Sequence, residues 1–135
     1  MIVLANGVFD VLHIGHVNHL KQARKMGDRL IVGVTIDDCV HKGPGRPVFS
    51  IRHRMKMLQE LRCVDEVFGV QSSLHALMIA KPNIFVKGRE YEHAVQQEDR
   101  KFCEAHGIEI RFTDGQTYSS TALLYWSERD KAPCV

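Results

Sequence analysis

The sequence predicts an α/β protein whose mostly parallel sheet is covered by helices on both faces. Short β-branched runs alternate along the chain with longer amphipathic segments. The short runs are almost continuously apolar, as expected of strands that are buried on both faces. Strict alternation of strands and helices implies right-handed crossovers and therefore parallel strands. We predict one Rossmann-like domain at residues 1–126, followed by a C-terminal tail or domain junction at 127–135.

Five runs of residues have the composition of buried strands. They lie at 2–5, 30–34, 64–70, 84–86 and 108–112. In a parallel sheet of this kind, ligands bind beyond the carboxyl ends of the strands, where the strand order reverses. The turns after the first and the fifth strand are therefore the places where we expect the chemistry.

Two of the predicted helices end at glycines. Apolar residues three positions apart predict a first helix at 16–26, and Gly27 follows it as a left-handed stop. The segment 98–106 has the pattern of a fourth helix, which Gly107 would end in the same way.

The remaining helices are predicted from capping and terminating residues. Ser50 can cap the second helix, and Pro82 would end the third helix, which we place at 74–80. A last helix should begin near Ser119 or Ser120.

The composition indicates a globular protein without a disulfide framework. The chain is 44% apolar and 25% charged, and its formal net charge of +2 is too small to indicate a nucleic acid partner. The four cysteines are widely spaced and form no C-x-x-C pair, so we expect reduced thiols and no structural metal. The N-terminal apolar run is too short for a signal peptide, and no long uncharged apolar span follows. We therefore expect a cytoplasmic protein that does not span a membrane.

The turn after the first predicted strand has the composition of a phosphate-binding loop. Gly7 and Gly15 allow the backbone to approach a ligand closely, and Phe9 should pack beneath the loop. His13 and His16 lie three residues apart, so two imidazoles on one face can donate hydrogen bonds to phosphate oxygens. A histidine pair can also bind a metal ion, but no third ligand is evident here, although His19 is near in the sequence. Anion binding is therefore the preferred interpretation.

Residues 6–16, which read NGVFDVLHIGH, resemble the opening of the small nucleotidyltransferases with a HIGH motif. That family includes glycerol-3-phosphate cytidylyltransferase and the adenylyltransferase domain that makes ADP-heptose. The resemblance continues at 42–48 (KGPGRPV), which is similar to the ADP-heptose branch, and at 85–91 (FVKGREY), which is similar to both the heptose and the glycerol branch. It extends to 119–121 (SST) before the last predicted helix. It implies a nucleoside triphosphate bound together with Mg²⁺, and a homodimer.

The resemblance and the composition of the turns together assign a candidate site. The residues expected to act in catalysis are His13, His16, Lys42, Arg54 and Ser120. The residues expected to bind the nucleotide are Gly7, Val8, Phe9, Asp10, Gly15, Arg46, Gly88, Tyr91, Tyr118, Ser119 and Thr121. The chain departs from the family pattern at Thr113, which replaces an arginine of the cytidylyltransferases, and at Glu90, which replaces an aspartate.

The resemblance implies an enzyme that transfers CMP from CTP to a small phosphorylated or phosphonylated alcohol and releases pyrophosphate. One alternative is an adenylyltransferase of the ADP-heptose type, which uses ATP and a sugar 1-phosphate. Another is a nucleotide-binding module without catalysis. Because no Ser-His-Asp set or activated cysteine is evident, we expect catalysis by positioning rather than through a covalent enzyme intermediate.

Overall fold

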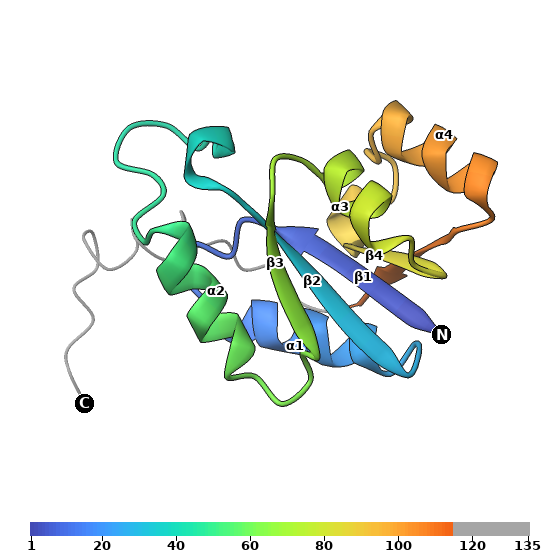
Figure 1. The fold of residues 1–135 in the computed structure, drawn as a ribbon, viewed down its shortest axis with the longest axis horizontal. Helices are drawn as coiled ribbons and strands as arrows, with labels where there is room; N and C mark the ends of the chain where they lie inside the picture. Colours follow the sequence, from blue (N-terminus) through green and yellow to red (C-terminus); the bar gives the residue numbers. More distant parts are fainter. Residues whose placement is uncertain (115–135) are drawn as a thin grey trace.

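The structure, a computed structural model, describes residues 1–114. Its strands all run parallel in one sheet with the order β3-β2-β1-β4-β5 (Figure 1). The strands are β1 (Ile2–Gly7), β2 (Arg29–Thr35), β3 (Glu66–Val70), β4 (Ile84–Gly88) and β5 (Glu109–Thr113). The predicted five-stranded parallel sheet is therefore confirmed.

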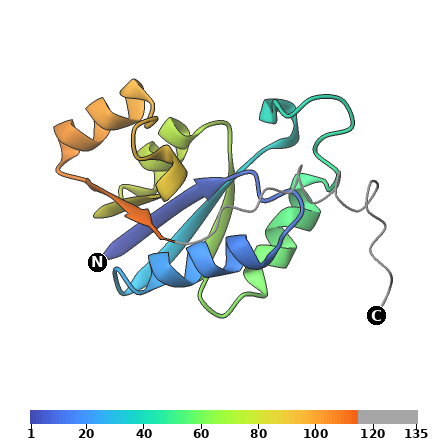
Figure 2. The same cartoon turned by 180° about the vertical axis from the view of Figure 1, so that it is seen from behind.

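Helices cover both faces of this sheet, as the two opposite views show (Figures 1 and 2). One face carries α1 (Ile14–Arg24) and α2 (Ile51–Gln59), and the other carries α3 (Ser73–Ala80) and α4 (Gln97–His106). Two short 3-10 helices, η1 (Asp37–Cys39) and η2 (Arg89–Tyr91), follow β2 and β4. No helix within residues 1–114 is both long enough and apolar enough to cross a membrane.

The sheet separates two apolar cores. Val3 and Ala5 of β1 pack with Leu20 of α1 and with α2, whereas Leu4 packs with Leu77 of α3 and with α4. This alternation follows from the period of two along a strand, and it requires apolar residues at every inner position because both faces are covered. The nearly continuous apolar runs in the sequence have this physical cause.

The ends of the first helix differ from the prediction. The helix begins at Ile14 rather than at 16, because His13 serves as its N-cap, and it ends at Arg24 with Lys25 in a right-handed conformation. Gly27 does not adopt the predicted left-handed stop. A Cβ atom at Gly27 would lie 2.6 Å from the backbone oxygen of Met1, so close packing against the start of β1 explains this glycine.

The stop after the fourth helix is confirmed. Gly107 has a φ of +67° and caps α4 in the left-handed conformation that glycine adopts without strain. The last predicted helix, near Ser119 or Ser120, lies outside the described residues.

Candidate active site

The strand order reverses between β1 and β4, and the loops that leave their carboxyl ends form the candidate site. The first half of the chain builds the sheet outward from β1 to β3, and the second half starts again at β4 on the other side of β1. Ala5 is level with Val86 across this boundary. Gly7 and Gly88, the last residues of β1 and β4, therefore flank the crevice where parallel α/β sheets bind ligands.

Phe9 supports the first loop from beneath, as predicted. Its side chain is buried, and its backbone has a φ of +49°, a left-handed conformation that is uncommon for a residue other than glycine. The ring meets the His16 ring edge to face, with 5.4 Å between the centroids. A Cβ atom on Gly7 would lie 3.0 Å from this phenyl ring, which explains why glycine ends β1.

His13 and His16 lie together at the start of α1. Their rings stack with centroids 3.8 Å apart and an interplanar angle of 25°. Nδ1 of His13 accepts a hydrogen bond from the Gly15 amide at 3.1 Å, and Nδ1 of His16 accepts one from the His13 amide at 3.2 Å. An Nδ1 atom that accepts a hydrogen bond carries no proton, so each neutral ring carries its proton on Nε2. The helix cap thus fixes both imidazoles as Nε2 donors.

His16 stays neutral in this environment. Burial, together with the smaller effects of the nearby His13, Lys42 and His19, lowers its pKa from 6.5 to about 3. A neutral imidazole that donates through Nε2 suits a phosphate oxygen, because the donor is already in place and needs no protonation near pH 7.

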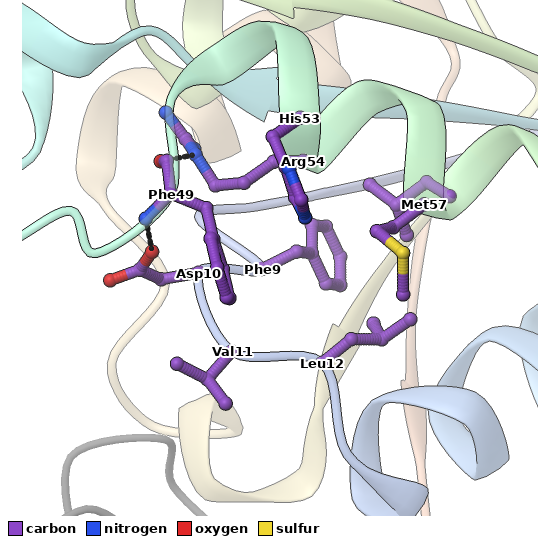
Figure 3. Close-up of a pocket in the computed structure, with 9 residues that line it drawn as sticks. Phe9, Asp10, Val11, Leu12, Phe49, His53, Arg54 and Met57 are labelled. Carbon is purple, nitrogen blue, oxygen red and sulfur yellow. Dashed lines mark hydrogen bonds between the residues drawn. The ribbon is translucent and has the colours of Figure 1, made fainter.

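Asp10 holds the basic loop against the histidine loop. It is buried, and its carboxylate accepts hydrogen bonds from Arg46 at 2.6 Å and from the Val48 amide at 2.8 Å. It also accepts one from the Phe49 amide at 2.9 Å (Figure 3). Burial alone would raise the pKa of Asp10, but the hydrogen bonds from Phe49, Val48 and Arg46 prevail and lower it. The structure therefore places Asp10 and Arg46, both predicted to bind nucleotide, in contact with each other.

Lys42 lies at the open end of the same loop. The side chain is exposed, and the glycines at 43 and 45 both have positive φ, with open space around them. Partial burial of the ammonium group and the charge of Arg46 lower the pKa of Lys42, whereas the charge of Asp10 acts in the opposite direction. The charge of Lys42 also contributes to lowering the pKa of His16.

Arg54 occupies the interior rather than the crevice. Its guanidinium donates to the carbonyl oxygens of Phe49, Val8 and Thr35 at 2.7 to 3.0 Å. It also pairs with Asp37 at 2.6 Å. Only 1% of the residue is exposed. In this structure, Arg54 links the ends of β1 and β2 to α2 and so supports the loops near the site.

A small apolar pocket lies beside Arg54, between α2 and the histidine loop (Figure 3). Its volume is about 130 Å³, and its walls include the stacked rings of Phe49 and His53 as well as Met57. His13 and His16 do not line it. Phe9 and Asp10 do line it, so the pocket adjoins the histidine loop.

The end of β4 forms the second wall of the crevice. Gly88 is followed by η2, which carries Glu90 and the exposed Tyr91. The Glu90 carboxylate folds back over Gly88, so that a Cβ atom there would lie 2.5 Å from its oxygen. Gly88 is predicted to admit the nucleoside base, which stays a prediction; in this structure the glycine makes room for Glu90.

Two residues near this wall were missed as site candidates. His19 accepts or donates a hydrogen bond at 2.7 Å to the hydroxyl of Thr113, and the Lys87 ammonium lies 4.7 Å from the centre of the Tyr91 ring. His19 follows His16 by three residues on α1, so the spacing that identified the first pair could have identified the third histidine too.

The second predicted phosphate-binding element falls outside the described residues. Tyr118, Ser119, Ser120 and Thr121 belong to it. Within residues 1–114 no group of three or more histidine, cysteine, aspartate or glutamate side chains is arranged to hold a metal ion.

A family model and curated relatives match most of this chain. A family model described as cytidylyltransferase-like matches residues 4–124. The chain is 42% identical over 127 residues to bifunctional protein HldE of Pseudomonas syringae pv. syringae (strain B728a), covering 91% of this chain and 27% of that protein. It is 39% identical over 135 residues to bifunctional protein HldE of Hahella chejuensis, covering 96% and 28%. The chain therefore spans little more than a quarter of the length of these relatives.

Solved structures share the fold. A lipopolysaccharide core biosynthesis protein from Thermoplasma volcanium superimposes with a TM-score of 0.70 and 28% identity, covering 88% of this chain and 98% of that one. Pantothenate synthetase from Thermus thermophilus gives a TM-score of 0.65 at 16% identity over 98% of this chain and 64% of that one, which is a likeness of fold alone.

Proposed function

Because the chain belongs to the cytidylyltransferase-like family, we propose that it transfers a nucleoside monophosphate from a nucleoside triphosphate to a small phosphorylated acceptor and releases pyrophosphate. The observation that carries the proposal is the pair of stacked imidazoles at the start of α1, both fixed as Nε2 donors beside the reversal of strand order. Phosphoryl transfer needs little covalent help from a protein, so positioning and stabilisation of charge suffice.

In the proposed reaction, an oxygen of the acceptor phosphate attacks the α-phosphorus. The bond between that phosphorus and the oxygen that bridges to the β-phosphate breaks, and pyrophosphate leaves. The Nε2 hydrogens of His13 and His16 stabilise the charge that grows on the phosphate oxygens, and Lys42 contributes a positive charge from the loop. Ser120 is assigned to the same role by the sequence resemblance alone.

We propose that Mg²⁺ accompanies the triphosphate and is held mainly by phosphate oxygens. The Asp10 carboxylate, which is the buried acid of the histidine loop, already accepts three hydrogen bonds from Arg46, Val48 and Phe49. A Mg²⁺ ion in such sites uses few protein carboxylates and keeps several water ligands. The bound ion would neutralise charge on the triphosphate.

ATP is the proposed donor, with a sugar 1-phosphate as acceptor. The resemblance of residues 42–48 to the adenylyltransferases that make ADP-heptose supports this choice, as does the similarity to the bifunctional HldE proteins. CTP with a phosphorylated or phosphonylated alcohol is the second candidate, because the matching family model is described as cytidylyltransferase-like. A homodimer remains a prediction from the resemblance.

Pyrophosphate release tests the proposal. The protein is incubated with Mg²⁺ and either ATP or CTP, each with glucose 1-phosphate or glycerol 3-phosphate. We expect release with at least one pair, and a decrease of kcat/KM by about 10² to 10³ in His16→Ala, by analogy with loss of one oxyanion-hole donor. His106→Ala, which changes an exposed histidine at the end of α4, serves as the control. Nucleotide binding without release from any pair would favour the inactive module instead.

A further inference from the structure

The end of β5 is tied to α1, the helix whose start carries the stacked imidazoles. Thr113, the last residue of β5, is buried, and its hydroxyl shares a hydrogen bond of 2.7 Å with Nδ1 of His19. The next residue, Asp114, is bound by Gln22. His19 and Gln22 lie three positions apart and therefore on one side of α1. Two consecutive residues at the strand end are thus held by the same side of this helix.

The contact between Gln22 and Asp114 uses the backbone of Asp114. The Asp114 amide donates to Oε1 of Gln22 at 2.8 Å, and Nε2 of Gln22 donates to the carbonyl oxygen of Asp114. The side-chain amide therefore binds both polar backbone groups of one residue, as an adjacent strand does in a sheet. β5 is the last strand in the order of the sheet, and its pairing with β4 ends at Thr113. Gln22 thus fixes the main chain at the point where the sheet no longer does.

The side chain of Asp114 contributes less to this attachment. Its carboxylate pairs with Arg89 of η2 at 2.6 Å, but the side chains of Asp114 and Arg89 are 80% and 49% exposed. Ion pairs with such exposure contribute little free energy. The buried contact of Thr113 with His19 and the backbone contact with Gln22 therefore determine where the chain leaves the sheet.

α1 also carries the histidine pair, His13 and His16, so one rigid element joins the strand end to the candidate site. Along a helix axis, the six positions from His16 to Gln22 span about 9 Å. The helix is fixed against the sheet through the fully buried Leu20 and Ala23. The distance from the strand end to the imidazoles is therefore set by the helix rather than by a loop.

The segment that follows Asp114 carries the second set of residues that the sequence resemblance assigns to the triphosphate. They are Ser119, Ser120 and Thr121. The chain from Asp114 to Ser120 has six residue steps, which span at most about 20 Å. The place where Asp114 is held therefore limits where these hydroxyl groups can lie relative to the histidine pair.

We propose that His19 and Gln22 are positioning residues for the nucleotidyl transfer. They fix the start of the segment with the three hydroxyl groups relative to the histidine pair on the same helix. The inference rests on the proposed function, and it assigns neither side chain a contact with the nucleotide. Because hydrogen bonds to phosphate weaken steeply with distance and misalignment, a strand end that is no longer held should lower the affinity for the triphosphate.

Calorimetry with Mg²⁺ and an ATP or CTP analogue that cannot be cleaved between the α- and β-phosphates tests this assignment. We expect the Kd to rise about tenfold or more in Gln22→Ala and in His19→Leu, with unchanged stoichiometry. A variant that only lost folded protein would show a lower stoichiometry at the wild-type Kd. His19→Asn keeps a polar atom near the place of Nδ1 and should retain the affinity within about threefold. Gln59→Ala, at an exposed glutamine of α2, is the matched control.

A double-mutant cycle shows whether Gln22 acts through the segment that it holds. Gln22→Ala should weaken nucleotide binding less in a Ser120→Ala background than in the wild type, because both changes affect the same contacts. This result would support the inference even if no pair of substrates releases pyrophosphate. Additive effects would overturn it, because Gln22 would then act independently of Ser120. Pyrophosphate release by a Gln22→Ala protein with wild-type nucleotide affinity would keep the proposed function and reject the positioning role.

Discussion

The imidazole rings of His13 and His16 stack 3.8 Å apart, and the backbone amides of the same helix terminus bind the Nδ1 atoms of both rings. The same hydrogen bonds that cap α1 therefore select the tautomer of each ring. An ordinary N-cap would use serine or aspartate. Serine has a single polar atom, and the second oxygen of an aspartate carboxylate can only accept hydrogen bonds, so it cannot donate to a phosphate. With histidine, the cap is formed by one nitrogen while the other can donate to a phosphate.

The half-buried, neutral state of His16 predicts a pH dependence of stability. Its pKa is about 3 in the folded protein against 6.5 when unfolded, so the unfolded chain binds a proton first as the pH falls. The free energy of unfolding should decrease from pH 6.5 toward pH 3. Between pH 6.5 and 4.5 the contribution of His16 is about 1 to 2 kcal/mol, after allowance for partial solvent screening.

Urea denaturation of the wild type and of His16→Gln at these two pH values measures this contribution. The variant should lose less stability on acidification than the wild type, whereas His53→Gln, at an exposed histidine of α2, should behave like the wild type. Equal acid sensitivity of His16→Gln and the wild type would mean that His16 is not buried in its neutral form.

Arg54 should be essential for stability. Arg54→Met leaves the carbonyl oxygens of Val8, Thr35 and Phe49 without their donor, and the free energy of unfolding should fall by about 3 to 5 kcal/mol. Arg52→Met, at an exposed position two residues earlier in α2, should change it by less than about 0.5 kcal/mol. If Arg54→Met kept wild-type stability and lost only activity, the catalytic role predicted from the sequence would be the better description.

Asp10 should control the exposure of the basic loop. Asp10→Asn removes the charge that holds Arg46 and weakens the hydrogen bonds from the Val48 and Phe49 amides, at a cost of about 1 to 3 kcal/mol. Local opening should become more frequent, and trypsin should cleave after Lys42 about tenfold faster or more. Asp38→Asn, at an exposed acid of η1, is the control. Equal cleavage rates in the two variants would show that Asp10 does not hold the loop.

The buried carboxylate of Asp99 depends on a single serine within the described part of the chain. Its Oδ2 accepts a hydrogen bond from the Ser73 hydroxyl, and its Oδ1 has no hydrogen-bond partner among residues 1–114. Ser73→Ala should therefore destabilise the protein by about 1 to 3 kcal/mol. Ser72→Ala removes only the cap of α3 and should cost about 1 kcal/mol. Thermal denaturation of both variants checks the order, and a Ser73→Ala protein as stable as the wild type would contradict the account.

The fold was predictable because its signals are local. Strands buried on both faces are apolar at every position, so β1, β2 and β4 are visible as continuous runs, and Gly107 marks a helix end through its own conformation. Gly27 also follows a helix, but glycine is needed there for a different reason: the Met1 carbonyl approaches too closely for a side chain. That contact joins residues far apart in the sequence, so no local sequence pattern predicts it.

The proximity of His13 and His16 was predictable from the sequence, whereas the other contacts of the candidate site were not. Spacing alone identified His13 and His16, because residues three apart on a helix are neighbours. The sequence could not show that Asp10 and Arg46 bind each other, or that Arg54 is enclosed by three carbonyl groups, because those partners come from other loops and strands. Lys87 is an ordinary strand-end lysine in the sequence, and only the packing of Tyr91 and Phe85 shows its environment.

The central claim is that the Nε2 hydrogens of His13 and His16 bind a nucleoside triphosphate, and imidazole ¹⁵N NMR tests it most directly. In the free protein, Nε2 of both rings should carry the proton at pH 7. Titration with Mg²⁺ and ATP, or with Mg²⁺ and CTP, should shift these two resonances in parallel with calorimetric saturation, while those of His53 and His106 stay in place. Unchanged His13 and His16 resonances in the saturated protein, or a proton found on Nδ1, would contradict the account.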